Sequence, residues 1–175
     1  MNRSSLMTRL FFIGIATCVI GINTSAAQNK AEATDSLRYP QEKHLANIKQ
    51  LTFGGDNAEA YWSFDSRKLV FQATRAEWNA SCDQIFIMDT KHPEKPSSIP
   101  DLVSTGKGRT TCAYFMPGNK SVLYASTHIG NESCPHVPPR RDDGKYVWPI
   151  YPDYDIFVAN LKGKIKKQLT NEPGY

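Results

Sequence analysis

Short apolar and β-branched segments alternate with clusters of polar turn residues along most of the chain. Each segment is four to eight residues long and is bounded by Gly, Asn, Asp or Pro, as strands and tight turns are. No segment shows the helical period of apolar residues over a length that would form a stable helix. The sequence therefore predicts an all-β fold. The expected strands are EAYWS (59–63), KLVFQAT (68–74), QIFIMDT (84–90), CAYFM (112–116), SVLYAST (121–127) and DIFVANL (155–161).

The segment AYWSFDSRKLVFQAT (60–74) has the same layout as AYFMPGNKSVLYAST (113–127), at an offset of 53. Ile85 matches Ile156 at an offset of 71, so the second unit has 18 extra residues between its second and third strands. Repetition of a four-stranded unit of about 40–50 residues is typical of a β-propeller. We expect a partial propeller with blade one at 59–104 and blade two at 112–170.

Stacking explains why such a unit is repeated. One four-stranded sheet buries little surface, whereas stacked sheets gain apolar cover on both faces. We expect Trp62 and its counterpart Phe115 to fill the space between sheets. A β-sandwich of two similar hairpins is the alternative, although it does not require matched strands at nearly fixed offsets.

Several motifs recur in the order found in a known family. LTFGGDNAEAYWSFD, the ending DIFVANLKGKIKKQLT and the final NEPGY resemble the TolB-type, WD-repeat-like β-propeller repeats of exported bacterial proteins. The resemblance covers residues 45–175. Phe64 and Ser66 stand where that pattern has proline and glycine, and Gln84 replaces the aspartate that Asp155 retains.

The resemblance implies that the two blades are part of a larger ring. It makes residues 48–52 an outer strand of a blade completed elsewhere. Closure needs roughly four to eight blades. We expect a truncated chain whose remaining blades come from missing sequence; assembly with further chains or an open arc are the alternatives.

The first residues predict export. Arg3 and Arg9 precede an apolar run of 13 residues (10–22), and small residues follow this run, as in a secretory signal peptide. We expect residues 1–27 to be this signal peptide, residues 28–44 to be a disordered lead-in, and the mature chain to be periplasmic or secreted without a membrane span. A lipoprotein anchor at Cys18 and an uncleaved anchor remain alternatives.

The charge balance argues against nucleic acid as a partner. The whole chain has 21 Lys+Arg against 17 Asp+Glu, and removal of residues 1–27 brings it closer to neutrality. A nucleic-acid-binding chain shows a basic stripe, and none is present here.

Three cysteines, Cys82, Cys112 and Cys134, follow the expected cleavage site. In an oxidising compartment we expect one disulfide among them and one thiol left over, and a bridge from Cys112 to Cys82 or to Cys134 is sterically reasonable. The sequence does not choose the pair. A metal site is not expected, because there is no C-x-x-C pair and the His/Cys/His spacing lacks a fourth ligand.

The extra residues of the second unit, 128–153, are the most distinctive local feature. Prolines stiffen this insertion, which lowers the entropy lost on binding. We interpret it as a recognition loop for a protein or glycan; the alternative is a loop that only caps a blade edge. The candidate binding residues are His136, Arg140, Arg141, Tyr146, Trp148 and Tyr151.

A second set of acidic residues could line a channel and hold a cation, although such residues more often support turns. These are Asp56, Glu59, Asp83 and Asp155.

Catalytic motifs such as G-x-S-x-G and H-E-x-x-H are missing from the sequence, so we expect no enzyme and no cofactor. We expect an exported, TolB-like protein-binding scaffold of the cell envelope. The alternative is the N-terminal propeller portion of a prolyl-oligopeptidase-like serine peptidase, whose catalytic domain would follow Tyr175. A sensor of glycans or small ligands is a third possibility.

Overall fold

The structure is a computed structural model that describes residues 37, 39–90 and 99–171. Contacts divide the chain into two units, Met1–Lys49 and Gln50–Tyr175. The expected signal peptide 1–27 lies outside the described residues, as does most of the lead-in 28–44.

The described part of the first unit contains no helix and no strand. A single turn is formed where the Glu42 N–H donates to the Tyr39 carbonyl at 2.9 Å. The Glu42 carboxylate accepts hydrogen bonds from the backbone N–H groups of His44 and Leu45. These hydrogen bonds lower the pKa of Glu42.

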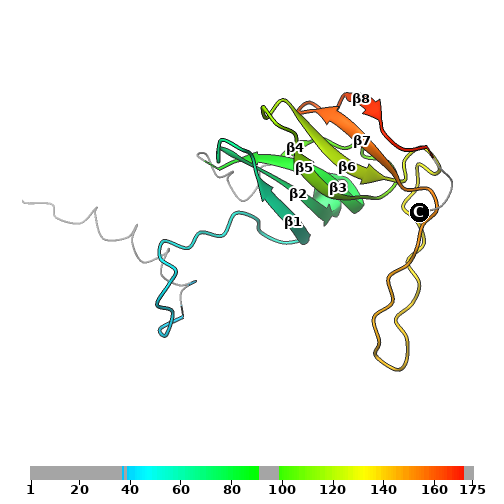
Figure 1. Cartoon of the computed structure of the whole chain (residues 1–175). Coiled ribbons are helices and arrows are strands. Elements are labelled where there is room, and N and C mark those ends of the chain that lie inside the picture. The colour runs from blue at the N-terminus through cyan, green and yellow to red at the C-terminus, as the bar shows by residue number, and fades with distance from the viewer. Residues whose placement is uncertain (1–36, 38, 91–98, 172–175) are drawn as a thin grey trace, which may run out of the picture. The chain divides into compact units, whose positions relative to one another are not determined.

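The second unit consists of two four-stranded antiparallel sheets, each with its strands in sequence order (Figure 1). This confirms the all-β class and the expectation of two four-stranded units. One short 3-10 helix, η1 (Ala76–Trp78), follows β2. The first sheet is β1 (Asp56–Trp62), β2 (Lys68–Arg75), β3 (Ala80–Asp89) and β4 (Asp101–Leu102); the second is β5 (Thr110–Phe115), β6 (Ser121–Ser126), β7 (Asp155–Asn160) and β8 (Ile165–Gln168).

Strand pairing repeats from one sheet to the other. Phe71 pairs with Phe86 in the first sheet, and Tyr124 pairs with Phe157 in the second. These partners are related by the offsets of 53 and 71 read from the sequence. The same offsets relate all the other β2–β3 partners from Lys68 to Ala73 to partners in β6–β7.

Backbone irregularities repeat as well. Glu59 and Cys112 sit at the register shift of β1 and β5 and have φ values of 51° and 52°. Ser66 and Asn119, in the turns that follow, both have φ of 55°. Left-handed backbone is uncommon for residues other than glycine. Its recurrence at matched positions shows that the two sheets share the same backbone conformation in detail.

The main core lies between the two sheets. Side chains alternate along a strand, so one set faces each side of a sheet. The first sheet contributes Val70, Ile85 and Ile87 together with Val103, the residue after β4. The second sheet contributes Ala113, Phe115, Val122, Tyr124, Phe157 and Ala159.

A smaller core covers the far face of the first sheet, which is the face that points away from the second sheet. Leu51 and the η1 residue Trp78 pack against it. The Trp78 ring lies 5.2 Å from the Phe86 ring and 6.5 Å from the Phe71 ring, in edge-on contacts. The buried members are Leu69, Phe71, Ala73, Ala80, Phe86 and Met88.

Two sequence expectations fail on this far face. Phe115 is fully buried between the sheets, but Trp62 is 53% exposed. Trp62 pairs with Leu69, so its side chain belongs to the far face and does not reach the second sheet. Residues 48–52 are not a strand. Leu51 contributes its side chain to the far face, and its backbone joins no sheet.

Candidate functional site

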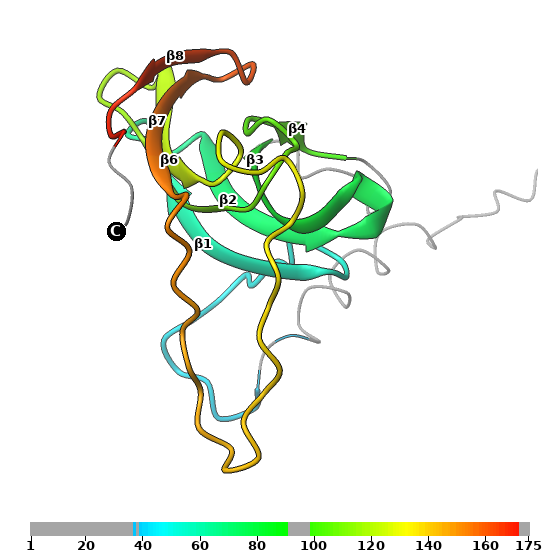
Figure 2. The same cartoon turned by 90° about the vertical axis from the view of Figure 1, so that its right-hand side faces the viewer.

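Residues 127–154, between β6 and β7, form a long arm that leaves the sheets and returns (Figure 2). Proline fixes φ and removes a backbone donor, which favours extended, unpaired chain. The arm turns at Arg141–Gly144, where the Gly144 N–H donates to the Arg141 carbonyl at 3.1 Å. Its prolines are Pro135, Pro138, Pro139, Pro149 and Pro152.

The base of the arm is tied to both sheets. A disulfide joins Cys134 in the arm to Cys82 in β3. The Gly108 N–H donates to the Glu132 carbonyl at 2.7 Å, and the Lys107 ammonium pairs with the Glu132 carboxylate. A Cβ on Gly108 would lie 2.7 Å from the Thr127 hydroxyl oxygen, so this close approach requires glycine.

The disulfide corrects one expectation. One bridge does form among the three cysteines, but it joins Cys82 to Cys134, and Cys112 is an exposed free thiol. Cys112 lies at the register shift of β5, and its N–H donates to the Gln72 side-chain oxygen at 3.2 Å. That shift in register cannot be read from the sequence.

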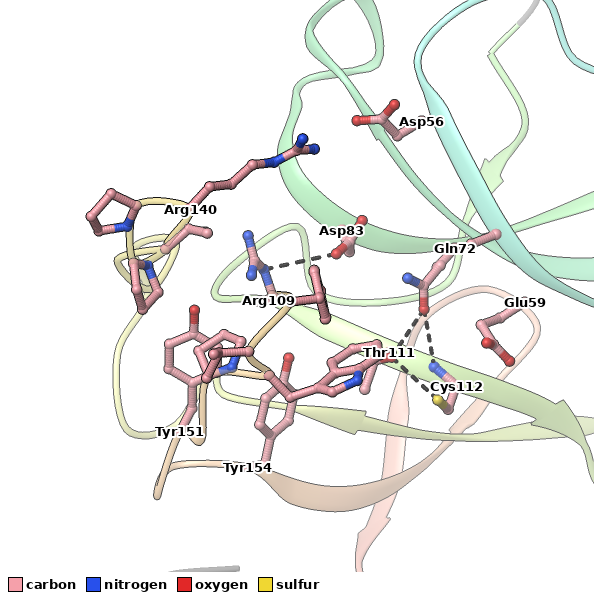
Figure 3. A pocket seen from close by; sticks show the side chains of 18 of the residues that line it. Asp56, Glu59, Gln72, Asp83, Arg109, Thr111, Cys112, Arg140, Tyr151 and Tyr154 are labelled. Atoms are coloured by element: carbon pink, nitrogen blue, oxygen red, sulfur yellow. Dashed lines mark hydrogen bonds and ion pairs between the residues drawn. The ribbon is translucent and has the colours of Figure 1, made fainter. Parts of the chain in front are cut away.

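A hollow of about 730 Å³ lies between the arm and the adjoining strands (Figure 3). Its walls carry charges of both signs and several aromatic rings. The acidic side chains are Asp56, Glu59 and Asp83, and the basic ones are Arg109, Arg140, Arg141 and Lys145. The aromatic side chains are Tyr146, Trp148, Tyr151 and Tyr154.

Arg109 is at the centre of the electrostatic arrangement. Its Nε atom is buried and lies 3.8 Å from a carboxylate oxygen of Asp83, which is too long for a hydrogen bond. Its guanidinium carbon lies 5.9 Å from the centre of the Tyr151 ring, within cation–π range. Asp83 also accepts a hydrogen bond from the Thr74 hydroxyl at 2.8 Å. The buried Nε atom is out of reach of a ligand, so what Arg109 offers the hollow is the positive charge of its guanidinium group.

The aromatic side chains differ in their surroundings. Tyr146 and Trp148 contact each other edge to face, with ring centres 5.1 Å apart, and are 72% and 79% exposed. Tyr151 donates from its hydroxyl to the His136 carbonyl at 2.8 Å and so joins the two sides of the arm. Burial raises the pKa of Tyr154 to about 12, so its hydroxyl is neutral at physiological pH.

Five of the six predicted binding residues line the hollow: Arg140, Arg141, Tyr146, Trp148 and Tyr151. His136 does not line it and contributes only its carbonyl to the arm. The Arg141 guanidinium makes a two-point contact with Asp143 at 3.0 and 2.7 Å, which raises the pKa of Arg141 and lowers that of Asp143. Arg141 is thus partly engaged by the arm itself.

Sequence reasoning missed Arg109, Tyr154 and Gln72. Gln72 accepts hydrogen bonds from the Thr111 hydroxyl and the Cys112 N–H, which links the two sheets at the floor of the hollow. An isolated arginine or glutamine in or beside a strand gives no sequence signal of its own. The charged partner of Arg109 could have been found only by pairing the ends of β3 and β5.

The suggested acidic set is divided by the structure. Asp56, Glu59 and Asp83 line the hollow, whereas Asp155 accepts hydrogen bonds from Gln168 and Thr170 in its own sheet. Within residues 37, 39–90 and 99–171, no group of three or more His, Cys, Asp or Glu side chains is arranged to hold a metal ion. The same described residues include no helix long and apolar enough to cross a membrane.

No protein-family model matches this chain, and no curated protein matches it either.

Proposed function

We propose that this protein is an exported, TolB-like β-propeller scaffold that binds a protein partner at the face carrying the arm. On this proposal the two sheets are neighbouring blades. Their sequential strand order, face-to-face packing and repeated backbone detail support that interpretation. A closed ring needs more blades than the two described sheets supply.

The observation that carries the binding proposal is the pair of exposed rings on the arm. Tyr146 and Trp148 are 72% and 79% exposed, beside a hollow lined by both charges. Tyr, Trp and Arg dominate the residues that supply most binding energy at protein interfaces. The prolines and the Tyr151–His136 hydrogen bond restrict the arm, so less entropy is lost when a partner binds.

Export is supported by two separate features. Residues 1–27 have the composition of a signal peptide. The disulfide between Cys82 and Cys134 suits an oxidising compartment such as the periplasm.

The test is site-specific photocrosslinking in cells that export the protein. A photoreactive phenylalanine replaces Trp148, and a control replaces Lys120, an exposed residue of the turn between β5 and β6. We expect a discrete protein adduct from position 148, reduced by adding Tyr146→Ser, and none from position 120. Identical adducts from both positions would contradict a specific partner at the arm.

A further inference from the structure

The outer face of the second sheet, which points away from the first sheet, is an open apolar surface. Ile156 is 37% exposed and Leu169, the residue after β8, is 46% exposed. Partly exposed Leu123, Ala125 and Val158 share the face, since Leu123 pairs with Val158 and Ala125 with Ile156. A contiguous apolar surface of this kind usually marks an interaction site.

The same positions of the first sheet are buried. Leu123, Ile156, Val158 and Leu169 correspond to Val70, Ile85, Ile87 and Val103, which form the first sheet's half of the main core. Hydrogen bonds confirm the last match. The Val103 N–H donates to the Ile85 carbonyl at 2.8 Å, and the Leu169 N–H donates to the Ile156 carbonyl at 2.7 Å. The open surface is therefore a second version of a surface that already binds a sheet.

The interface between the two sheets shows which kind of surface would bind this outer face. Within the chain, the matching surface of the first sheet binds the face of the second sheet that carries Phe115, Val122, Tyr124, Phe157 and Ala159. The corresponding residues of the first sheet lie on its far face: Trp62, Leu69, Phe71, Phe86 and Met88. The two outer sides of the sheet pair thus carry the two halves of the interface buried between the sheets.

One segment occurs at both outer sides. The sequence KQLT is present at 49–52 and again at 167–170. Leu51 packs against the far face of the first sheet, and Leu169 belongs to the outer face of the second. The cover that Leu51 provides is incomplete, because a hollow of about 200 Å³ lies among Leu51, Leu69, Phe71 and Met88.

We propose that the outer face of the second sheet binds the far face of the first sheet of a second copy of this chain, head to tail. Leu169 of one copy takes the place of Leu51 in the other. Exchange of an identical element is a low-cost route to association, and a head-to-tail interface builds rings or filaments. One end of the outer face borders the arm, because Ala125 and Ile156 line a hollow together with Trp148.

Sedimentation velocity of the purified chain over a dilution series tests the proposal. Ile156→Lys blocks the outer face and Trp62→Lys blocks the far face. Both positions are already exposed, so the fold tolerates the charge. Ile129→Lys is the control for an added charge, because Ile129 is an isoleucine in the arm that is 58% exposed and lies outside both proposed surfaces. We expect the unmodified chain and the control to associate, and each blocked variant alone to stay monomeric.

Mixing distinguishes the head-to-tail arrangement from others. An equimolar mixture of the Ile156→Lys and Trp62→Lys variants still has one intact half of the interface on each chain, so it should form dimers and nothing larger. An unmodified chain that is monomeric at every concentration overturns the proposal. So does association of the Trp62→Lys variant alone, which would indicate a two-fold contact between outer faces.

Leu51→Ala tests the exchange. Removing the resident leucine should tighten association by about tenfold or more, the change expected from losing a largely buried side chain that competes for the site. Unchanged association of this variant would show that Leu169 does not replace Leu51.

Discussion

The two sheets have matching strand pairings but different surroundings. In the first sheet both faces are covered: one by the second sheet, the other by Leu51 and Trp78. In the second sheet one face is buried and the other is open. Ile85 is fully buried whereas its counterpart Ile156 is 37% exposed. A repeated sequence therefore determines the conformation of each unit, while its neighbours determine how much each position contributes to stability.

The largest expected effect compares these two isoleucines directly. Ile85→Ala should lower the free energy of unfolding by about 2–5 kcal/mol, because it leaves a cavity in the main core. Ile156→Ala should cost less than about 1 kcal/mol, because solvent already reaches the side chain. Urea titration of monomeric protein measures both changes. Equal losses would show that the outer face is covered in solution.

Next in size is the covalent link between the first sheet and the arm. Replacing Cys82 and Cys134 together by serine should cost about 2–4 kcal/mol, since the bridge closes a long loop and restricts the unfolded chain. Cys112→Ser is the control and should leave stability nearly unchanged, because this thiol is exposed and unbridged. Non-reducing peptide mapping checks the pairing, and a bridge to Cys112 would contradict it.

A smaller contrast concerns two matched hydroxyls. The Ser104 hydroxyl is buried, accepts from the Ile85 N–H at 2.9 Å and donates to Gln84 at 2.8 Å. Thr170 makes the same contacts with Ile156 and Asp155, in an exposed position. Ser104→Ala should cost about 1–3 kcal/mol, because the buried Ile85 N–H loses this acceptor and the Gln84 side-chain oxygen keeps only the Gly106 N–H. Thr170→Ala should cost under about 0.5 kcal/mol in the same urea titration.

The smallest effect at neutral pH is expected at Tyr124, whose counterpart in the first sheet is Phe71. The Tyr124 hydroxyl is buried, has no hydrogen-bond partner among the described residues, and its pKa is raised to about 12 by burial. Tyr124→Phe should therefore change stability by no more than about 1 kcal/mol at pH 7.

The same variant should differ more in alkali. The folded-state pKa of Tyr124, about 12, exceeds the unfolded value of about 10. The contribution of the protonated Tyr124 hydroxyl to the free energy of unfolding is therefore fully present below pH 10 and is lost as the pH rises toward 12. Tyr124→Phe should reduce this loss. Part of the loss should remain in this variant, because the pKa of Tyr154 is also raised to about 12. Thermal melting from pH 9 to 12 measures the slope, and an identical slope in the variant would place Tyr124 in contact with water.

Much of the fold could be predicted because the repeat is local. Offsets of 53 and 71 give both the strands and their pairing, since antiparallel neighbours in a meander follow one another in sequence. Trp62 could not be placed, because its surroundings depend on which neighbour covers the far face. Residues 48–52 resemble a strand, yet they pair with neither β1 nor β4, the two edge strands of the first sheet.

The binding residues were predictable in part. The arm is visible as an insertion between matched strands, and its exposed rings follow from its composition. Arg109 and Gln72 join the site only because β2 and β3 lie beside the beginning of β5, which no linear pattern shows. A disulfide among the three cysteines was predictable, but the pair was not, because it depends on how close the arm comes to β3.

The link between Cys82 and Cys134 has a mechanical consequence. If the two ends of the chain are pulled apart, tension passes through the sulfur atoms and bypasses the 52-residue separation between them. Strands β4, β5 and β6 lie wholly inside that stretch, so their backbone is not extended while the bridge is intact. About 190 Å of chain, at roughly 3.6 Å per residue, stays hidden until a reductant opens the bridge.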